Sequence, residues 1–210
     1  MRVLVACEFS GIVRDAFAAA GHDAWSCDLL PCEAGGQHIT GDVLQVLADG
    51  WDLMIAHPPC TYLCVSGMHW TRRGKRRQSL TDDALEFVRQ LMAAPIARIA
   101  IENPVSIIST EIRPPDQIIQ PWQFGHDASK KTCLWLQGLP KLKPTMLVEP
   151  RLINGKPRWE NQTDSGQNKL PPTKDRWKLR AKTYQGIAEA MAVQWGNQSS
   201  FARQLNLPLC

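Results

Sequence analysis

Short apolar runs that alternate with amphipathic stretches fill the first half of the chain, and this alternation constrains the fold more than any other feature. Each run is too short for a helix and is bounded by polar or glycine residues. The runs lie at 3–7, 23–28, 51–56 and 96–101, with helical patterns at 11–20 and 81–94 between them. Strands that alternate with helices form right-handed βαβ units. We therefore expect an α/β fold with a doubly wound, mostly parallel, Rossmann-like sheet.

The chain has 210 residues, of which 44% are hydrophobic and 21% charged. This length suits one domain, 1–210, and this composition is typical of soluble globular proteins. Since no apolar run reaches the roughly 20 residues of a membrane span and the N-terminus reads as a strand, we expect a cytoplasmic protein and a monomer. Seven cysteines without a repeated Cys-x-x-Cys pair argue against a disulfide framework and a zinc site, so no metal is expected.

Positive charge is concentrated in two regions. Five of the six residues from Arg72 to Arg77 are cations, and between Lys141 and Lys182 eleven Lys and Arg stand against four Asp and Glu, an excess of seven. Residues 139–178 are also rich in proline and lack periodicity, so we interpret them as an irregular basic insertion before a last helix at 184–195. Such clusters suit a polyanion such as DNA, although charge runs are often solvated surface.

The run Pro58-Pro59-Cys60 follows an apolar strand directly. Two prolines restrict the backbone, so the loop is stiff and the cysteine is held in place. A nucleophilic cysteine needs such a fixed position and a raised thiolate fraction. The alternative is a strand-end turn with an incidental cysteine, and His57 before it is read as structural.

A second polar pair, Glu102-Asn103, ends the next predicted strand. Neighbouring strand ends of a doubly wound sheet lie roughly 5–10 Å apart, so Cys60 and Glu102 could reach one ligand. Partial burial should raise the pKa of Glu102 and make it a proton donor. This pair suits attack on a pyrimidine: a thiolate adds to carbon 6, an acid at N3 stabilises the charge, and carbon 5 becomes nucleophilic.

With these residues the sequence resembles the cytosine-C5 DNA methyltransferases, whose motif order it follows over most of its length. The resemblance implies S-adenosylmethionine as cofactor and a cytosine flipped out of DNA as substrate. It assigns catalysis to Cys60, Glu102, Asn103 and Lys130. It assigns cofactor binding to Phe9, Ser10, Gly11, Asp28, Asp42, Val43, Pro58 and Tyr184.

The loop 61–78 after the cysteine resembles the segment that closes over the flipped base in that family. Cations in it would bind phosphates and an aromatic side chain would fill the gap in the stack. The nucleic-acid contacts expected here are Trp70, Arg72, Arg73, Lys75, Arg76 and Arg77.

The sequence departs from the family in three places. Ile12, Val13 and Arg14 stand where further glycines are usual, Ala128 replaces a glutamine, and Lys130 replaces an arginine. Only residues 139–178 could serve as a target-recognition region, so sequence selectivity should be short, relaxed or absent. This compactness suggests a phage or mobile-element enzyme, by analogy alone.

Three other interpretations remain. A methyltransferase acting on an exocyclic nitrogen would need an aromatic residue after Pro-Pro, where Cys60 stands. An enzyme that modifies carbon 5 of a free pyrimidine nucleotide, or transfers a modified methyl group, would need no recognition region. A non-catalytic nucleic-acid-binding relative would not need both Cys60 and Glu102.

Overall fold

The computed structural model describes residues 1–65, 71, 73–74 and 77–197. Seven strands of this part form one sheet in the order β3-β2-β1-β4-β5-β7-β6. The first five in that order are parallel to one another, and β7 is antiparallel to both of its neighbours. The strands are β1 (Arg2–Ala6), β2 (Asp23–Asp28), β3 (His38–Thr40), β4 (Leu53–Ala56), β5 (Ile99–Pro104), β6 (Gln117–Ile119) and β7 (Thr132–Gln137). The predicted doubly wound, mostly parallel α/β sheet is confirmed.

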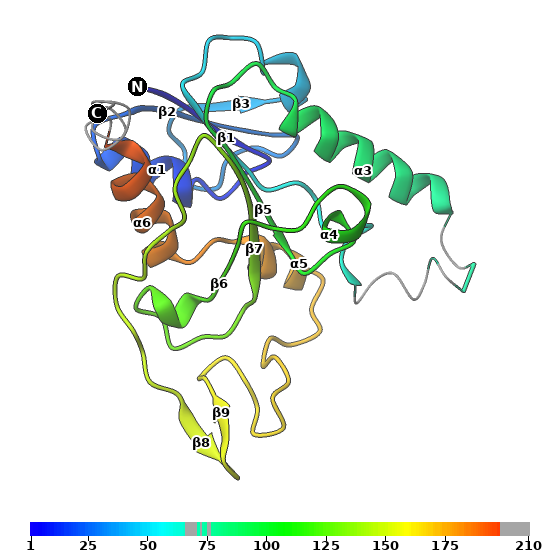
Figure 1. Ribbon diagram of the computed structural model, residues 1–210, viewed down its shortest axis with the longest axis vertical. Coiled ribbons are helices and arrows are strands. Elements are labelled where there is room, and N and C mark those ends of the chain that lie inside the picture. Colours follow the sequence, from blue (N-terminus) through cyan, green and yellow to red (C-terminus); the bar gives the residue numbers. More distant parts are fainter. Residues whose placement is uncertain (66–70, 72, 75–76, 198–210) are drawn as a thin grey trace, which may run out of the picture.

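Helices cover both faces of the sheet (Figure 1). On one face lie α1 (Ile12–Ala19) and α6 (Gln185–Gly196), whose apolar side chains share a core cluster with Val3 and Val5 of β1. On the other face lie α3 (Gln78–Met92) and the short α4 (Ile108–Glu111), which pack with Leu4 and Ala6 of the same strand. Because successive strand residues point to opposite faces, the continuous apolar run of β1 supplies both cores.

Most element boundaries differ by one to three residues from those expected, with the largest differences at α3 and β5. The helix predicted to start at Thr81 begins at Gln78, and Arg77, with φ −67° and ψ 134°, is its N-cap residue. Thr81, which we expected to cap the helix, is instead buried within the first turns of α3, on the side that packs against the sheet. The strand predicted to end at residue 101 continues to Pro104, because β7 pairs with β5 along its whole length.

Residues 139–178 contain a hairpin that the sequence analysis did not predict. β8 (Arg151–Ile153) and β9 (Lys156–Arg158) are joined by Asn154 and Gly155, which both adopt positive φ angles, 51° and 72°. This two-residue turn matches the right-handed twist of paired strands and favours Asn-Gly. The hairpin projects from the end of the molecule away from α1 and β2 (Figure 1).

The remaining elements are short. Two 3₁₀ turns, η1 (Val43–Gln45) and η2 (Pro121–Gln123), follow β3 and β6, and the helix α5 (Arg176–Ala181) precedes α6. None of the helices in the described part of the chain is long and apolar enough to cross a membrane. Within the same residues no group of three or more His, Cys, Asp and Glu side chains is arranged to hold a metal ion.

Candidate active site

The carboxyl ends of β1, β4 and β5 lie level with one another. Ala6 of β1 is paired with Ala56 of β4, and Ala56 with Ile101 of β5. The next residues along each strand, Cys7, His57 and Glu102, therefore emerge side by side. From β1 the chain adds β2 and β3 on one side, and from β4 it adds β5 on the other side. The strand order therefore reverses between β1 and β4, and ligands bind at such a topological switch point in sheets of this kind.

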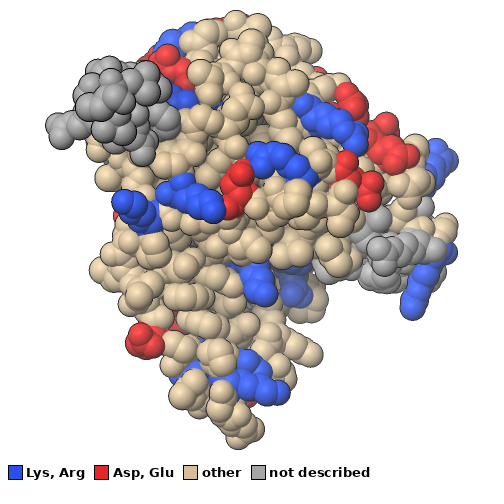
Figure 2. Space-filling model, viewed as in Figure 1, with Lys and Arg blue, Asp and Glu red and all other residues tan. Residues whose placement is uncertain are grey.

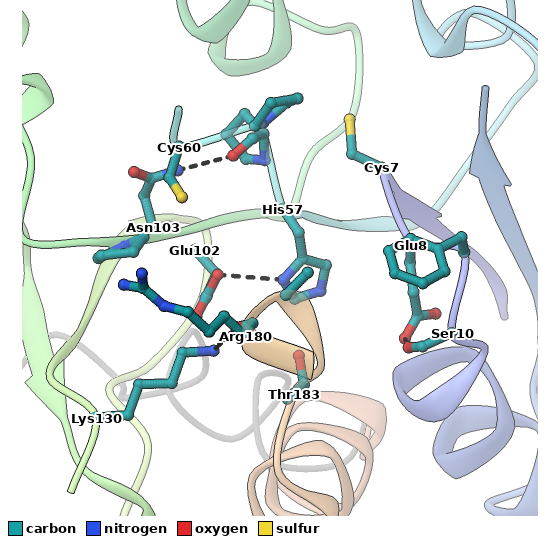
Figure 3. A pocket seen from close by; sticks show the side chains of 15 residues that line it. Cys7, Glu8, Ser10, His57, Cys60, Glu102, Asn103, Lys130, Arg180 and Thr183 are labelled. Atoms are coloured by element: carbon teal, nitrogen blue, oxygen red, sulfur yellow. Dashed lines mark hydrogen bonds and ion pairs between the residues drawn. The ribbon is translucent and has the colours of Figure 1, made fainter. Parts of the chain in front are cut away.

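A cavity of about 100 Å³ lies at this edge. Three neighbouring strand ends and the segment around α5 form its wall (Figure 3). The lining residues are Cys7, Glu8, Phe9, Ser10, His57, Pro58, Pro59, Cys60, Glu102, Asn103, Pro104, Lys130, Arg180, Ala181 and Thr183. The structure thus brings together Cys60, Glu102, Asn103, Lys130, Phe9, Ser10 and Pro58, all of which the sequence singled out.

The cysteine loop is fixed by its neighbour on β5. The buried Asn103 side chain donates from Nδ2 to the Pro58 carbonyl oxygen over 2.8 Å. The Cys60 carbonyl oxygen accepts from the amides of Leu63 and Cys64, at 3.1 and 2.9 Å, so a turn follows the cysteine at once. Since prolines precede Cys60 and a hydrogen-bonded turn follows it, the thiol is held at the cavity on both sides.

Glu102 is paired with His57. The Glu102 Oε2 atom lies 3.4 Å from His57 Nδ1 (Figure 3). Burial raises the pKa of Glu102, but the hydrogen bond to His57, the charge of Lys130 and a hydrogen bond to Thr132 together hold it below its ordinary value. The expectation of a raised pKa was therefore wrong, because the register that aligns β4 with β5 places a histidine beside the carboxylate.

His57 was interpreted as structural, yet it lines the cavity and touches Glu102. Its other ring nitrogen, Nε2, is buried without a hydrogen-bond partner. The signal that could have identified it is the strand register, because His57 and Glu102 each follow a paired residue, Ala56 and Ile101.

Burial raises the pKa of the Cys60 thiol, and Cys64 and Glu102 raise it further, while Arg180 and Lys130 oppose them. The thiol is therefore protonated at neutral pH in this state, contrary to the raised thiolate fraction that a nucleophile needs. His57 faces Glu102 rather than supplying this activation.

The other end of the cavity is built by the residues after β1. The Glu8 carboxylate accepts from the amides of Val13 and Arg14, at 2.7 and 3.2 Å, and from the Ser10 hydroxyl at 3.2 Å. It therefore fills the amino end of α1, where a glycine-rich loop would leave the amides free. Phe9 and Ser10 line the cavity as a result of this turn.

Gly11 and Arg14 explain the departure from a glycine-rich motif. Gly11 has φ +78°, and a Cβ there would lie 2.6 Å from Arg14 Nη2. The Arg14 side chain is buried, and its guanidinium is hydrogen-bonded to Asp15 and Ser26. Gly11 thus shapes the turn but does not line the cavity, since Arg14 fills the space beside it.

The acids expected at the cofactor end lie near Cys7. Cys7 lines the cavity, and burial raises the pKa of its thiol. The charge of Asp28 raises this pKa further, and that of Asp42 does so less strongly. Asp28 accepts from the Leu30 amide and Asp42 from the Leu44 amide, so both side chains also stabilise turns. Val43 is a core residue.

Tyr184 lies outside the cavity. It lines a neighbouring recess and packs edge-on against His126, with ring centroids 5.2 Å apart. The preceding residue, Thr183, reaches the cavity instead.

Most of the predicted basic-loop contacts lie outside the described residues. These are Trp70, Arg72, Lys75 and Arg76. Arg73 is exposed and Arg77 caps α3.

The positive charge of residues 139–178 is partly balanced within that region. Arg151 pairs with Asp164 at 3.2 Å and Lys169 with Glu160 at 2.8 Å. Figure 2 shows Lys and Arg side chains spread over one face, with acidic side chains beside several of them.

No protein-family model matches this sequence, and a search of curated proteins finds no match. Several solved structures, among them the following three, show a partial likeness. A prophage-encoded protein of E. coli, proposed to be a DNA modification methyltransferase, is 14% identical with a TM-score of 0.47 and is matched over 73% of this chain and 53% of its own. The Entamoeba histolytica methyltransferase EhMeth is 15% identical with a TM-score of 0.49, over 71% and 58%. The 16S rRNA methylase RmtB is 15% identical with a TM-score of 0.31, over 65% and 55%.

The chain thus spans little more than half the length of each of these proteins.

Proposed function

We propose that the protein is an S-adenosylmethionine-dependent methyltransferase that adds a methyl group to carbon 5 of cytosine in DNA through a covalent adduct with Cys60. The observation that carries this proposal is a single cavity at the switch point of the sheet. Cys60, Glu102 and Lys130 line it together with Phe9 and Ser10. A nucleophile, a carboxylate and a cation therefore face the same space as Phe9, Ser10 and Pro58, three of the residues that the resemblance assigns to the cofactor.

The cofactor end of the cavity fits this assignment. Phe9 offers an aromatic surface, and the acids Asp28 and Asp42 lie within electrostatic range of Cys7 at the same end, as an adenosine with two ribose hydroxyls requires. When bound there, S-adenosylmethionine supplies an electrophilic methyl group on a sulfonium. Glu8 already occupies the amides of α1, so the contacts in this protein would come from side chains rather than from a glycine-rich loop.

The residues of the chain would act on the base in the following way. The Cys60 thiol would give up its proton to water, and the resulting thiolate adds to carbon 6 and forms a sulfur–carbon bond, while the electron pair of the 5,6 double bond spreads towards N3. Glu102 contacts the N3 edge, and His57 at 3.4 Å can pass a proton through it to N3. Carbon 5 would then take the methyl group as the bond between that group and the sulfonium sulfur breaks, with the electron pair left on that sulfur. The carbon-5 proton leaves to water, its electron pair restores the 5,6 double bond as the bond from carbon 6 to the Cys60 sulfur breaks, and N3 returns its proton to Glu102.

The pocket must widen to hold both ligands. Its volume of about 100 Å³ is below the roughly 300–1,000 Å³ of ordinary ligand sites. Arg180, Ala181 and Thr183 form one wall, so outward movement of the segment around α5 would make the room. We assign residues 139–178, next to this wall, to the surroundings of the target base, where they would contact DNA.

The experiment that tests the proposal uses labelled S-adenosylmethionine and 5-fluorocytosine. Fluorine at carbon 5 cannot leave as a proton, so the enzyme should remain bonded to methylated substrate through Cys60. The adduct is detected by denaturing electrophoresis and mapped by mass spectrometry. Cys60→Ser should form none, whereas Cys64→Ser, one turn further along the chain, should form it as the wild type does.

Duplex DNA, single-stranded DNA and the free nucleotide should be compared in the same assay. An adduct with either DNA supports the proposal. An adduct with the nucleotide alone would show that the substrate is a free nucleotide and not DNA, and it would still support nucleophilic attack by Cys60. No adduct with any of the three would refute carbon-5 chemistry and leave the exocyclic-nitrogen methyltransferase and the non-catalytic nucleic-acid-binding relative.

A further inference from the structure

The segment 175–183, which contains α5, is fastened across the cavity at three points. Trp177 packs against Phe9, with ring centroids 5.8 Å apart and the planes tilted by 55°. Lys182 Nζ forms an ion pair with Glu33 Oε2 at 2.7 Å. Lys130 Nζ donates to the carbonyl oxygens of Arg180 at 2.9 Å and Lys182 at 3.3 Å. These contacts fix the backbone that carries Arg180.

The Arg180 guanidinium enters the cavity from this segment. In Figure 3 it extends over Glu102, between Lys130 and the Cys60 side of the cavity. Within the described part of the chain the guanidinium nitrogens make no hydrogen bond or ion pair, whereas the backbone carbonyl oxygen of Arg180 accepts from Lys130. A guanidinium has five donors and a permanent charge. Arg180 is therefore a cation whose donors remain available to an anion in the cavity.

Lys130 differs from Arg180 in this respect. Its ammonium is committed to two backbone carbonyls. The charges that act on Cys60 come from Cys64 on its own loop, Glu102 on β5, Lys130 before β7 and Arg180 on α5, and Arg180 is the stronger of the two cations. When Cys60 becomes a thiolate beside Glu102, the Arg180 guanidinium is a positively charged group of the cavity wall whose donors are free to pair with it.

We propose that Arg180 is a positioning residue that acts through Cys60, and that segment 175–183 places its guanidinium beside the thiolate. The role rests on the proposed function, because it matters only if Cys60 is a nucleophile. Trp177 of the same segment packs on Phe9 at the cofactor end. One segment therefore contacts both the cofactor end of the cavity and, through Arg180, the end that holds Cys60. The sequence could not single out Arg180 among the neighbouring cations, since only the path of the chain brings it to Cys60.

The test measures the charge of Cys60 without substrate or cofactor. The rate of alkylation by iodoacetamide is followed from pH 6 to 10.5, and the peptide that contains Cys60 is quantified by mass spectrometry. The plateau rate at high pH reports access to the thiol, and the midpoint reports formation of the thiolate. Arg180→Gln should raise the midpoint by roughly 0.5 to 1 unit, which slows alkylation at pH 8 by about 3- to 10-fold.

Two variants serve as controls. Arg180→Lys keeps a positive charge, so its midpoint should lie close to that of the wild type. Lys178→Gln removes a charge from the same helix, but Lys178 lies by the Trp177 ring and does not line the cavity, so its midpoint should match the wild type.

An unchanged midpoint in Arg180→Gln would overturn the inference, as would an equal shift in Lys178→Gln. Failure of the proposed function would give a different result. A shifted midpoint without any 5-fluorocytosine adduct would support the action of Arg180 on Cys60 and refute the proposed carbon-5 methyltransferase activity.

Discussion

Replacing Asn103 by Ala tests how the cysteine loop is held. Asn103 is 1% exposed, and its Nδ2 donates to the Pro58 carbonyl oxygen over 2.8 Å, two residues before Cys60. The substitution removes this donor and leaves a carbonyl oxygen of the loop without its partner. Asn103 Oδ1 has no hydrogen-bond partner in the described structure, so the bond from Nδ2 to Pro58 is the side-chain hydrogen bond that the substitution removes.

The magnitude follows from that bond. Removing one partner of a buried hydrogen bond costs about 1–3 kcal/mol. For a domain of this size each kcal/mol lowers the melting temperature by about 2–4 °C, so a drop of roughly 2–12 °C is expected. The freed loop should also hold Cys60 less firmly, and adduct formation with 5-fluorocytosine should slow by at least about 10-fold, because a nucleophile is effective only in a fixed position.

The assay combines urea unfolding with the rate of adduct formation. Ser106→Ala is the matched control: Ser106 is 3% exposed on the same side of the fold, and its hydroxyl has no hydrogen-bond partner. Its removal should change the unfolding free energy by less than about 0.5 kcal/mol. If Asn103→Ala were as stable as Ser106→Ala and formed the adduct at the wild-type rate, the hydrogen bond to Pro58 would not be what holds the loop.

Two further predictions concern stability. The pKa of folded Glu102 lies below the unfolded value of about 4.3, so its stabilisation is complete above that pH and is lost as the pH falls through the folded pKa. Unfolding free energies between pH 6 and 3 should therefore fall less steeply in Glu102→Gln, while Glu111→Gln, at an exposed position, keeps the wild-type slope; equal slopes in all three would contradict the His57 pairing. Gly11→Ala should destabilise by about 1–3 kcal/mol in thermal or urea unfolding, because its φ is +78° and a Cβ would meet the buried Arg14 guanidinium. A wild-type melting temperature would show that Arg14 moves freely.

Much of the fold was predictable because its signals are local. Most of the parallel strands are short apolar runs whose limits follow from neighbouring polar and glycine residues. The strand predicted at 23–28 has the same first and last residues as β2 in the structure. The strands β3, β6 and β7 were not predicted: β3 and β6 have only three residues each, and β7 is defined by its pairing with β5 on one side and β6 on the other. The β8–β9 hairpin had a local signal, Asn154-Gly155, which the emphasis on proline and charge obscured.

The position of the candidate site was determined by the sequence itself, whereas its electrostatics were decided by the tertiary structure. Cys60 and Glu102 follow apolar strands, and parallel strands of one sheet end at the same edge, so their meeting needs no more than local pattern and topology. The direction of the Glu102 pKa depends on His57, and that of the Cys60 pKa on burial and on Glu102, which outweigh Arg180 and Lys130; all of these groups come from distant parts of the chain. Charges act through space over a few ångströms, and only the folded chain sets those distances.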